Sequence, residues 1–269
     1  MMGLGSRFAS IVESRGPLCV GIDPSADSLR TVGLPDTAAG ALEFGRAVVA
    51  VAAPRVGIVK PQVAYFERFG SAGYGALELL IREAREAGLV VIADAKRGDI
   101  GSTMKGYASA WLGDGPLQSD ALTVSPYQGF AALEPAFSLA KASGATVFVL
   151  SSTSNPDADH VQRASLSGEM LPVLVARFAR ERSGDTKTVG VVVGATRDLA
   201  ARGLTASDLD GLLILAPGFG TQGASLTDIS HIFGAASPNV IPSVSRSVVY
   251  DGLANAATAI EEHLRELGL

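Results

Sequence analysis

The densest group of residues that could do chemistry follows an apolar run, Leu89 to Ala93. Asp94 comes directly after this run, Lys96 two positions later, and Asp99 within a further turn. Side chains two apart on an extended strand point to the same side, so Asp94 and Lys96 are expected to share one partly desolvated place. Burial disfavours each charge alone, but their mutual attraction keeps both ionised. Such a lysine would be a charged proton donor.

An isolated Asp-x-Lys pair would be explained well enough as a structural salt bridge. Lys60 changes this interpretation because it ends another apolar run, Val56 to Lys60, and so adds a second cation at a strand end. Both lysines are expected to project into the same mouth. The sequence therefore predicts an alternating charged array, which consists of Lys60, Asp94, Lys96 and Asp99.

A second group of residues is typical of phosphate binding. Gly218, Gly220 and Gly223 form a G-x-G-x-x-G pattern after the run Leu212 to Leu215. A nicotinamide site would need an acidic residue about 20 positions later, and residues 237–247 contain no Asp or Glu. We therefore expect backbone N–H groups of this loop to hold a phosphate, with Arg246 closing on it after the last apolar run.

Composition excludes several other classes of protein. The net charge of −5 gives no positive field for nucleic acid or an anionic membrane. The only cysteine, Cys19, lies in an apolar run, which excludes a disulfide framework and favours a reducing cytoplasm. Three scattered histidines lack metal-ligand spacing, so we expect surface histidines and no metal site. Residues 1–16 lack an apolar signal region, and no run approaches the roughly 20 residues of a membrane span.

The elements that must position these residues recur along the whole chain. Between helical patterns such as Leu77 to Ala87, near-continuous apolar runs indicate parallel strands covered on both faces. There are eight: Leu18–Ile22, Val56–Lys60, Leu89–Ala93, Ala121–Val124, Ala145–Leu150, Val189–Val193, Leu212–Leu215 and Val240–Val244. Alternation of this kind predicts a (β/α)₈ TIM barrel as a single domain over residues 1–269, with a doubly wound open sheet as the alternative.

Polar residues at the ends of these runs favour the barrel, because a barrel gathers its strand ends on one face. They are Asp23, Lys60, Asp94 with Lys96, Ser125, 151–154, Thr196, and Ser245 with Arg246, while the seventh run ends in Pro217 with Gly218. The stretch from Asn155 to Lys187 lacks strand character. We expect an extended loop and a helix, Met170 to Phe178, over the mouth of the barrel.

These motifs resemble the orotidine 5'-phosphate decarboxylase family, in particular its longer bacterial subgroup. The segment from Asp94 to Ile100, with Thr103, is similar to the family signature D-x-K-x-x-D-I-x-x-T. Other family positions follow in order between about residues 18 and 250: Asp23, Lys60, Ser154 before Asn155-Pro156, Pro217, Gln222 and Arg246. Two positions depart from the family pattern, since Ser245 and Asp157 stand where glycine is frequent.

The resemblance implies decarboxylation of orotidine 5'-phosphate to uridine 5'-phosphate and carbon dioxide, without a metal or cofactor, in pyrimidine biosynthesis. It implies that Lys96 donates the proton within the charged array. It also implies a cytoplasmic homodimer with shared active sites, in which Asp99 and Thr103 reach into the partner's site. The remaining substrate-binding residues would be Asp23 at the ribose, Ser154 at the pyrimidine, and Pro217, Gln222 and Arg246 around the phosphate side.

Two alternatives remain at this point. A related barrel enzyme, such as a hexulose phosphate synthase or a keto-gulonate phosphate decarboxylase, would share Asp-x-Lys-x-x-Asp but use Mg²⁺ to stabilise an enediolate. A barrel that binds a phosphorylated ligand without turnover would act as a sensor or scaffold. Ser154-Asn155-Pro156 and Gln222 favour the orotidine substrate.

Overall fold

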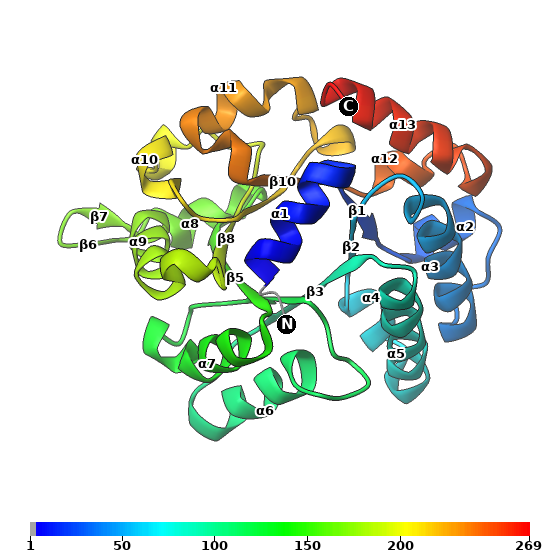
Figure 1. Ribbon diagram of the computed structural model, residues 1–269, viewed down its shortest axis with the longest axis horizontal. Coiled ribbons are helices and arrows are strands. Elements are labelled where there is room, and N and C mark those ends of the chain that lie inside the picture. The colour runs from blue at the N-terminus through cyan, green and yellow to red at the C-terminus, as the bar shows by residue number, and fades with distance from the viewer. Residues whose placement is uncertain (1–3) are drawn as a thin grey trace.

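Eight parallel strands close into a barrel in the computed structural model, which describes residues 4–269 (Figure 1). The predicted (β/α)₈ barrel is confirmed, and the open sheet is excluded because every barrel strand has two neighbours. Around the ring the order is β1-β10-β9-β8-β5-β4-β3-β2. The strands are β1 (Cys19–Ile22), β2 (Ile58–Pro61), β3 (Val90–Arg97), β4 (Ala121–Val124), β5 (Thr146–Ser152), β8 (Val189–Val193), β9 (Ile214–Pro217) and β10 (Val240–Val244).

Helices surround the ring and cover its outer face (Figure 1). The α-helices of the described residues are α1 (Leu4–Arg15), α2 (Ala26–Thr31), α3 (Ala38–Ala52), α4 (Ala64–Glu67), α5 (Gly70–Glu86), α6 (Gly101–Leu112), α7 (Glu134–Ser143), α8 (Asp159–Gln162), α9 (Leu171–Ser183), α10 (Ala206–Leu209), α11 (Ile229–Phe233), α12 (Arg246–Val249) and α13 (Ala256–Glu266). In α5, Leu77, Leu80 and Ile81 form the buried stripe that periodicity predicted. Gly88 adopts φ +83° just beyond this helix, as expected at a helix end.

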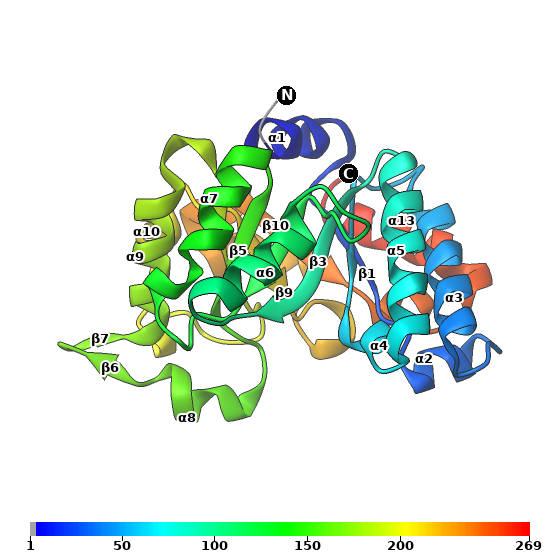
Figure 2. The same ribbon diagram turned by 90° about the horizontal axis from the view of Figure 1, so that it is seen from below.

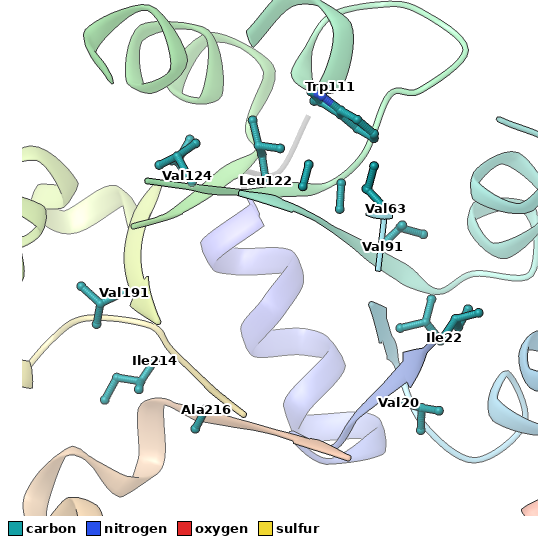
Figure 3. Close-up of a cluster of buried hydrophobic side chains, with 14 of the residues drawn as sticks. Val20, Ile22, Val63, Val91, Trp111, Leu122, Val124, Val191, Ile214 and Ala216 are labelled. Atoms are coloured by element: carbon teal, nitrogen blue, oxygen red, sulfur yellow. The ribbon is translucent and has the colours of Figure 1, made fainter. Parts of the chain in front are cut away.

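The strands are apolar on both faces because each face packs against a different core. Successive side chains alternate, so Cys19 joins the cluster inside the barrel while Val20 joins the cluster beneath the helices. Figure 3 shows Val20, Val91 and Leu122 pointing outward from the ring. Cys19 is fully buried, as expected for a small side chain in an apolar strand.

One end of the barrel is covered by α1, which lies across it (Figures 1 and 2). Ile11 and Val12 of this helix pack against the cluster inside the barrel. Ile11 comes so close to β2 that a Cβ added to Gly57 would lie 2.1 Å from its Cγ2 atom. The strand ends that carry the candidate site residues lie at the other end of the barrel, where α8 and the segment that follows it project (Figure 2).

The prediction for Asn155 to Lys187 was partly wrong. This stretch contains α8 and a two-stranded hairpin, β6 (Ser165–Leu166) and β7 (Glu169–Met170), before α9 begins. Instead of lying over the mouth, α9 packs on the barrel wall against β5 and β8, where Val175, Ala176 and Ala179 are buried. The hairpin was missed because its strands are too short to produce a periodic pattern.

His263 was expected at the surface, but its side chain is only 12% exposed and its Nε2 atom lies 2.9 Å from Ser247 Oγ.

Within the part of the chain that the structure describes, no helix combines the length and apolar character that crossing a membrane requires.

Candidate active site

A cavity of about 370 Å³ opens at the carboxyl ends of the barrel strands. Its wall is formed by residues of β2, β3, β5, β8, β9 and β10, by Asp23 after β1, and by the loops that follow several of these strands. Eight of the ten site residues expected from the sequence line it: Asp23, Lys60, Asp94, Lys96, Ser154, Pro217, Gln222 and Arg246. Side chains up to about 220 positions apart in the chain therefore meet around one space because a barrel collects its strand ends.

The Asp94 carboxylate is the buried centre of a cluster of polar side chains in this cavity. Lys60 Nζ lies 3.1 Å from Asp94 Oδ2, and Lys96 Nζ lies 2.5 Å from Asp94 Oδ1. Gln62 Nε2 also donates to Asp94 Oδ2 at 3.0 Å. Lys60 and Asp94 are buried, whereas the side chain of Lys96 is 44% exposed and faces the cavity. The buried Asp94 of the Lys60–Asp94 ion pair thus also contacts the Lys96 ammonium group, which a ligand in the cavity can reach.

The electrostatics of this cluster keep Asp94 and Lys60 charged at neutral pH. Burial alone would raise the pKa of Asp94, but Lys60 and Lys96 together hold it well below its usual range. Burial alone would lower the pKa of Lys60, but Asp94 and Asp23 raise it above its usual value. Both shifts favour the ionised forms. The cavity therefore contains fixed charge that does not depend on a bound ligand.

Two residues that contact Asp94 were missed in the sequence. Gln62 lies two positions after Lys60 on the same strand edge, so the alternation that linked Asp94 with Lys96 could have found it. Thr123 is 1% exposed, and its hydroxyl donates to Asp94 Oδ1 at 3.0 Å. A threonine within the run Ala121–Val124 looks like an ordinary strand residue, so the sequence gives no indication that Thr123 contacts Asp94.

Asp99 and Thr103 do not line the cavity of their own chain. Asp99 is partly exposed in the turn after β3, where its carboxylate accepts a hydrogen bond from the Ile100 N–H at 2.7 Å. Thr103 is exposed in the first turn of α6. The structure therefore brings together three members of the predicted array, Lys60, Asp94 and Lys96, and leaves the fourth at the surface nearby.

The glycine-rich loop after β9 forms the opposite wall. Gly218, Gly220 and Gly223 all have positive φ, between +71° and +116°, which explains the glycine at each position. The loop makes only a short 3₁₀ turn, Gly220–Gln222, rather than the start of a longer helix. Gln222 lies on this turn, and its Oε1 atom accepts a hydrogen bond from Ser154 Oγ at 3.2 Å. This contact joins the loops after β5 and β9 across the cavity.

Asp23 and Arg246 stand at the remaining side of the opening. Asp23 follows β1, and its Oδ2 atom accepts a hydrogen bond from Ser245 Oγ. The other carboxylate oxygen of Asp23 is buried without a hydrogen-bond partner among the described residues. Arg246 begins α12 and is exposed at the rim. An anion at the rim and a hydroxyl-bearing group near Asp23 would each meet a suitable partner.

Among the side chains that the structure describes, no group of three or more His, Cys, Asp or Glu residues is placed to hold a metal ion.

Comparison with known proteins gives the same family from sequence and from structure. Residues 16–262 match the family described as orotidine 5'-phosphate decarboxylase / HUMPS. An orotidine 5'-phosphate decarboxylase from Streptomyces coelicolor is 50% identical over 259 residues, covering 94% of this chain and 91% of the relative. One from Corynebacterium glutamicum is 46% identical, covering 93% of this chain and 92% of the relative.

Solved structures agree over nearly the whole length. A crystal structure of a Streptomyces avermitilis protein has a TM-score of 0.92 and 46% identity, covering 100% of this chain and 95% of its own. The Leishmania donovani OMP decarboxylase has a TM-score of 0.82 and 32% identity, covering 99% of this chain and 98% of its own.

Proposed function

This chain belongs to the orotidine 5'-phosphate decarboxylase / HUMPS family, and we propose that its cavity converts orotidine 5'-phosphate into uridine 5'-phosphate and carbon dioxide without a metal or cofactor. Decarboxylation of this nucleotide is the activity of the chain, as it is of its relatives at 45–50% identity. The proposed setting is cytoplasmic pyrimidine biosynthesis. The observation that carries the mechanism is the Lys60–Asp94–Lys96 cluster within the cavity.

The chemical difficulty is an electron pair left on a ring carbon. When the bond between that carbon and the carboxylate breaks, carbon dioxide departs and both electrons stay on an sp² carbon of the pyrimidine. Without a cofactor to accept them, stabilisation must come from charge already in position. The Lys96 ammonium is the accessible cation of the cluster, so it stabilises the developing charge and then transfers a proton from Nζ to the carbon.

The buried partners of Lys96 hold this cation in place. Asp94 contacts both ammonium groups, and Lys60 balances the charge that Asp94 would otherwise carry alone in a buried setting. In the proposed pose the departing carboxylate lies close to Asp94. Repulsion between the two carboxylates then disfavours the bound substrate relative to the transition state.

The rest of the nucleotide is assigned to the cavity walls. The ribose hydroxyls are placed near Asp23 and Lys60, and the pyrimidine edge near Ser154. The phosphate is placed between the loop from Pro217 to Gln222 and Arg246, whose guanidinium can bond two phosphate oxygens. Binding energy from the phosphate side is remote from the broken bond, and it can be used to orient the reacting carbon against Lys96.

The proposal includes a homodimer. Asp99 lies outside its own chain's cavity, at the surface next to exposed Ile100, whose side chain is 62% exposed. Thr103 lies on the same segment. A second copy packed against this segment would receive Asp99 and Thr103 into its own cavity, and each site would then contain the full array.

The activity is tested by following the ultraviolet absorbance of orotidine 5'-phosphate with purified protein. We predict that Lys96→Ala lowers kcat by at least about 10³-fold, because one group supplies both charge stabilisation and the proton. Affinity for uridine 5'-phosphate, measured by calorimetry, should change little. Lys141→Ala serves as the control because Lys141 is an exposed residue of α7 outside the cavity.

Two outcomes would contradict the proposal. If the wild-type protein bound the nucleotide but never consumed it, the barrel would be a binding protein rather than an enzyme. If a chelator abolished turnover and Mg²⁺ restored it, the metal-dependent chemistry of the related synthases would replace the mechanism proposed for Lys96.

A further inference from the structure

The pairing of β3 with β4 is irregular beside the reacting residues. Ala93 pairs with Leu122 and Arg97 pairs with Val124. Between these two pairs β3 places three residues, Asp94, Ala95 and Lys96, opposite a single residue of β4. Such a bulge re-aims side chains and leaves backbone groups without their regular partners. The single residue opposite the bulge is Thr123.

The Thr123 hydroxyl faces the bulge and acts both as a hydrogen-bond donor and as an acceptor there. Its Oγ1 atom accepts a hydrogen bond from the Lys96 N–H at 2.9 Å and donates one to Asp94 Oδ1 at 3.0 Å. The side chain is 1% exposed, so water does not replace it. A hydroxyl is a donor and an acceptor at once, and only Ser or Thr offers that in a side chain of this size. One buried group thus connects the backbone of Lys96 to the carboxylate of Asp94.

Lys96 needs such support because its backbone is unusual. It has φ +49°, a left-handed conformation that is unfavourable for a residue with a Cβ atom. Residues held in this way persist where their surroundings determine the geometry. The conformation brings Lys96 Nζ within 2.5 Å of Asp94 Oδ1, the same oxygen that receives the Thr123 hydroxyl. Without that hydroxyl, both the amide of Lys96 and the oxygen of Asp94 would lose a partner.

We propose that Thr123 is a positioning residue for the decarboxylation, which fixes the Lys96 ammonium and the Asp94 carboxylate relative to each other. Thr123 does not line the cavity, so it acts through these two residues rather than on the substrate. This inference rests on the proposed function, in which Lys96 donates the proton. Its effect should therefore fall on the chemical step and leave nucleotide binding almost unchanged.

The test compares three variants with the wild-type protein. Thr123→Val keeps the shape but removes the hydroxyl, and Thr123→Ser keeps the hydroxyl. The control is Thr146→Val, because Thr146 is equally buried and its hydroxyl bonds the Lys187 carbonyl at the start of β5, at the far end of the barrel. We expect Thr123→Val to lower kcat by about 10- to 100-fold, as for a lost hydrogen bond to a charged group, with KM and uridine 5'-phosphate affinity within about twofold. Thr123→Ser should restore most of kcat, and Thr146→Val should leave it unchanged.

Several results would overturn the inference. A kcat for Thr123→Val within twofold of wild type would show that the hydroxyl has no positioning role. Equal losses of kcat in Thr123→Val and Thr146→Val, or a rise in KM alone, would indicate a general structural effect. If Val is not tolerated by the fold, Thr123→Ala against Thr123→Ser makes the same comparison. An inactive wild-type protein would contradict the proposed function itself, which separates the two failures.

Discussion

At the scale of single residues, the buried Asp94 makes the stability of the fold depend on pH in acid, in addition to the role proposed for it in catalysis. Its pKa is lower in the folded protein than the value of about 3.9 for a free side chain, so its charge stabilises the fold above that pH. As the pH falls from about 5 toward the lower folded pKa, that contribution is lost. The unfolded state takes up the proton first, which makes unfolding more favourable in acid.

We predict that Asp94→Asn lowers the free energy of unfolding at pH 7 by about 3 kcal/mol, because it leaves the buried Lys60 without its carboxylate partner. The difference between wild type and variant should shrink below about pH 4. Urea unfolding at several pH values between 7 and 3 measures it. A difference that stays constant over this range would contradict the linkage between Asp94 ionisation and stability.

Sequence spacing predicted that Lys60 and Lys96 meet at Asp94, but not the backbone that brings them together. Asp94 and Lys96 were expected to lie on the same side of an extended strand, yet Lys96 is left-handed and reaches Asp94 across a bulge. A bulge depends on the register between two strands, which a single sequence does not contain. For the same reason Thr123, opposite the bulge, could not be distinguished from other strand residues.

At the scale of elements, a buried arginine braces the loop after β5. Arg202 ends the 3₁₀ turn Ala200–Arg202 and is 2% exposed. Its Nη1 atom donates to Gln162 Oε1 at 2.7 Å, and its Nη2 atom lies 2.5 Å from Asp159 Oδ1. Gln162 in turn bonds both the backbone and the hydroxyl of Thr153, at 2.9 and 2.8 Å. Thr153 immediately precedes Ser154, the residue assigned to the pyrimidine.

We predict that Arg202→Met raises KM for orotidine 5'-phosphate by about fivefold, because a loosened loop no longer presents Ser154 to the base. Inhibition by ribose 5-phosphate, which lacks a base, should be unchanged. Steady-state kinetics with both ligands distinguishes the two effects. Arg46→Met is the control, since Arg46 forms an exposed ion pair with Glu83 on the outer helices. Equal weakening of both ligands would show that Arg202 supports the whole site rather than the base-binding loop.

Strong local patterns predicted the elements well, and weak ones did not. Each of the eight apolar runs overlaps a barrel strand, because strands buried on both faces are apolar throughout. The predicted position of α9 over the mouth was wrong, because an amphipathic pattern shows that a helix has a buried face but not which surface it covers. The β6–β7 hairpin, with Ser167 and Gly168 at positive φ, is held by a turn rather than by apolar periodicity.

At the scale of the whole molecule, the proposed dimer predicts that two inactive variants restore activity when they assemble together. A Lys96→Ala chain lacks its own proton donor but can lend Asp99 to a partner, whereas an Asp99→Ala chain has the donor but lends nothing. Refolding equal amounts of the two inactive variants together should restore about one quarter of the wild-type sites, through mixed dimers with one complete site each. Sedimentation analysis of the mixture checks assembly. No recovery of activity in dimers that do form would place Asp99 outside the partner's site.

The single barrel domain over residues 1–269 stays a prediction, and residues 1–3 lie outside the described part. Beyond them, the helix α1 has a consequence for turnover. Because the barrel interior is packed with apolar side chains and Ile11 and Val12 cover its other end, we expect uridine 5'-phosphate and carbon dioxide to leave through the same opening, at the carboxyl ends of the strands. In the proposed mechanism, carbon dioxide formed beside Lys96 would leave past the bound product or after it. The next substrate molecule can enter only when uridine 5'-phosphate has gone.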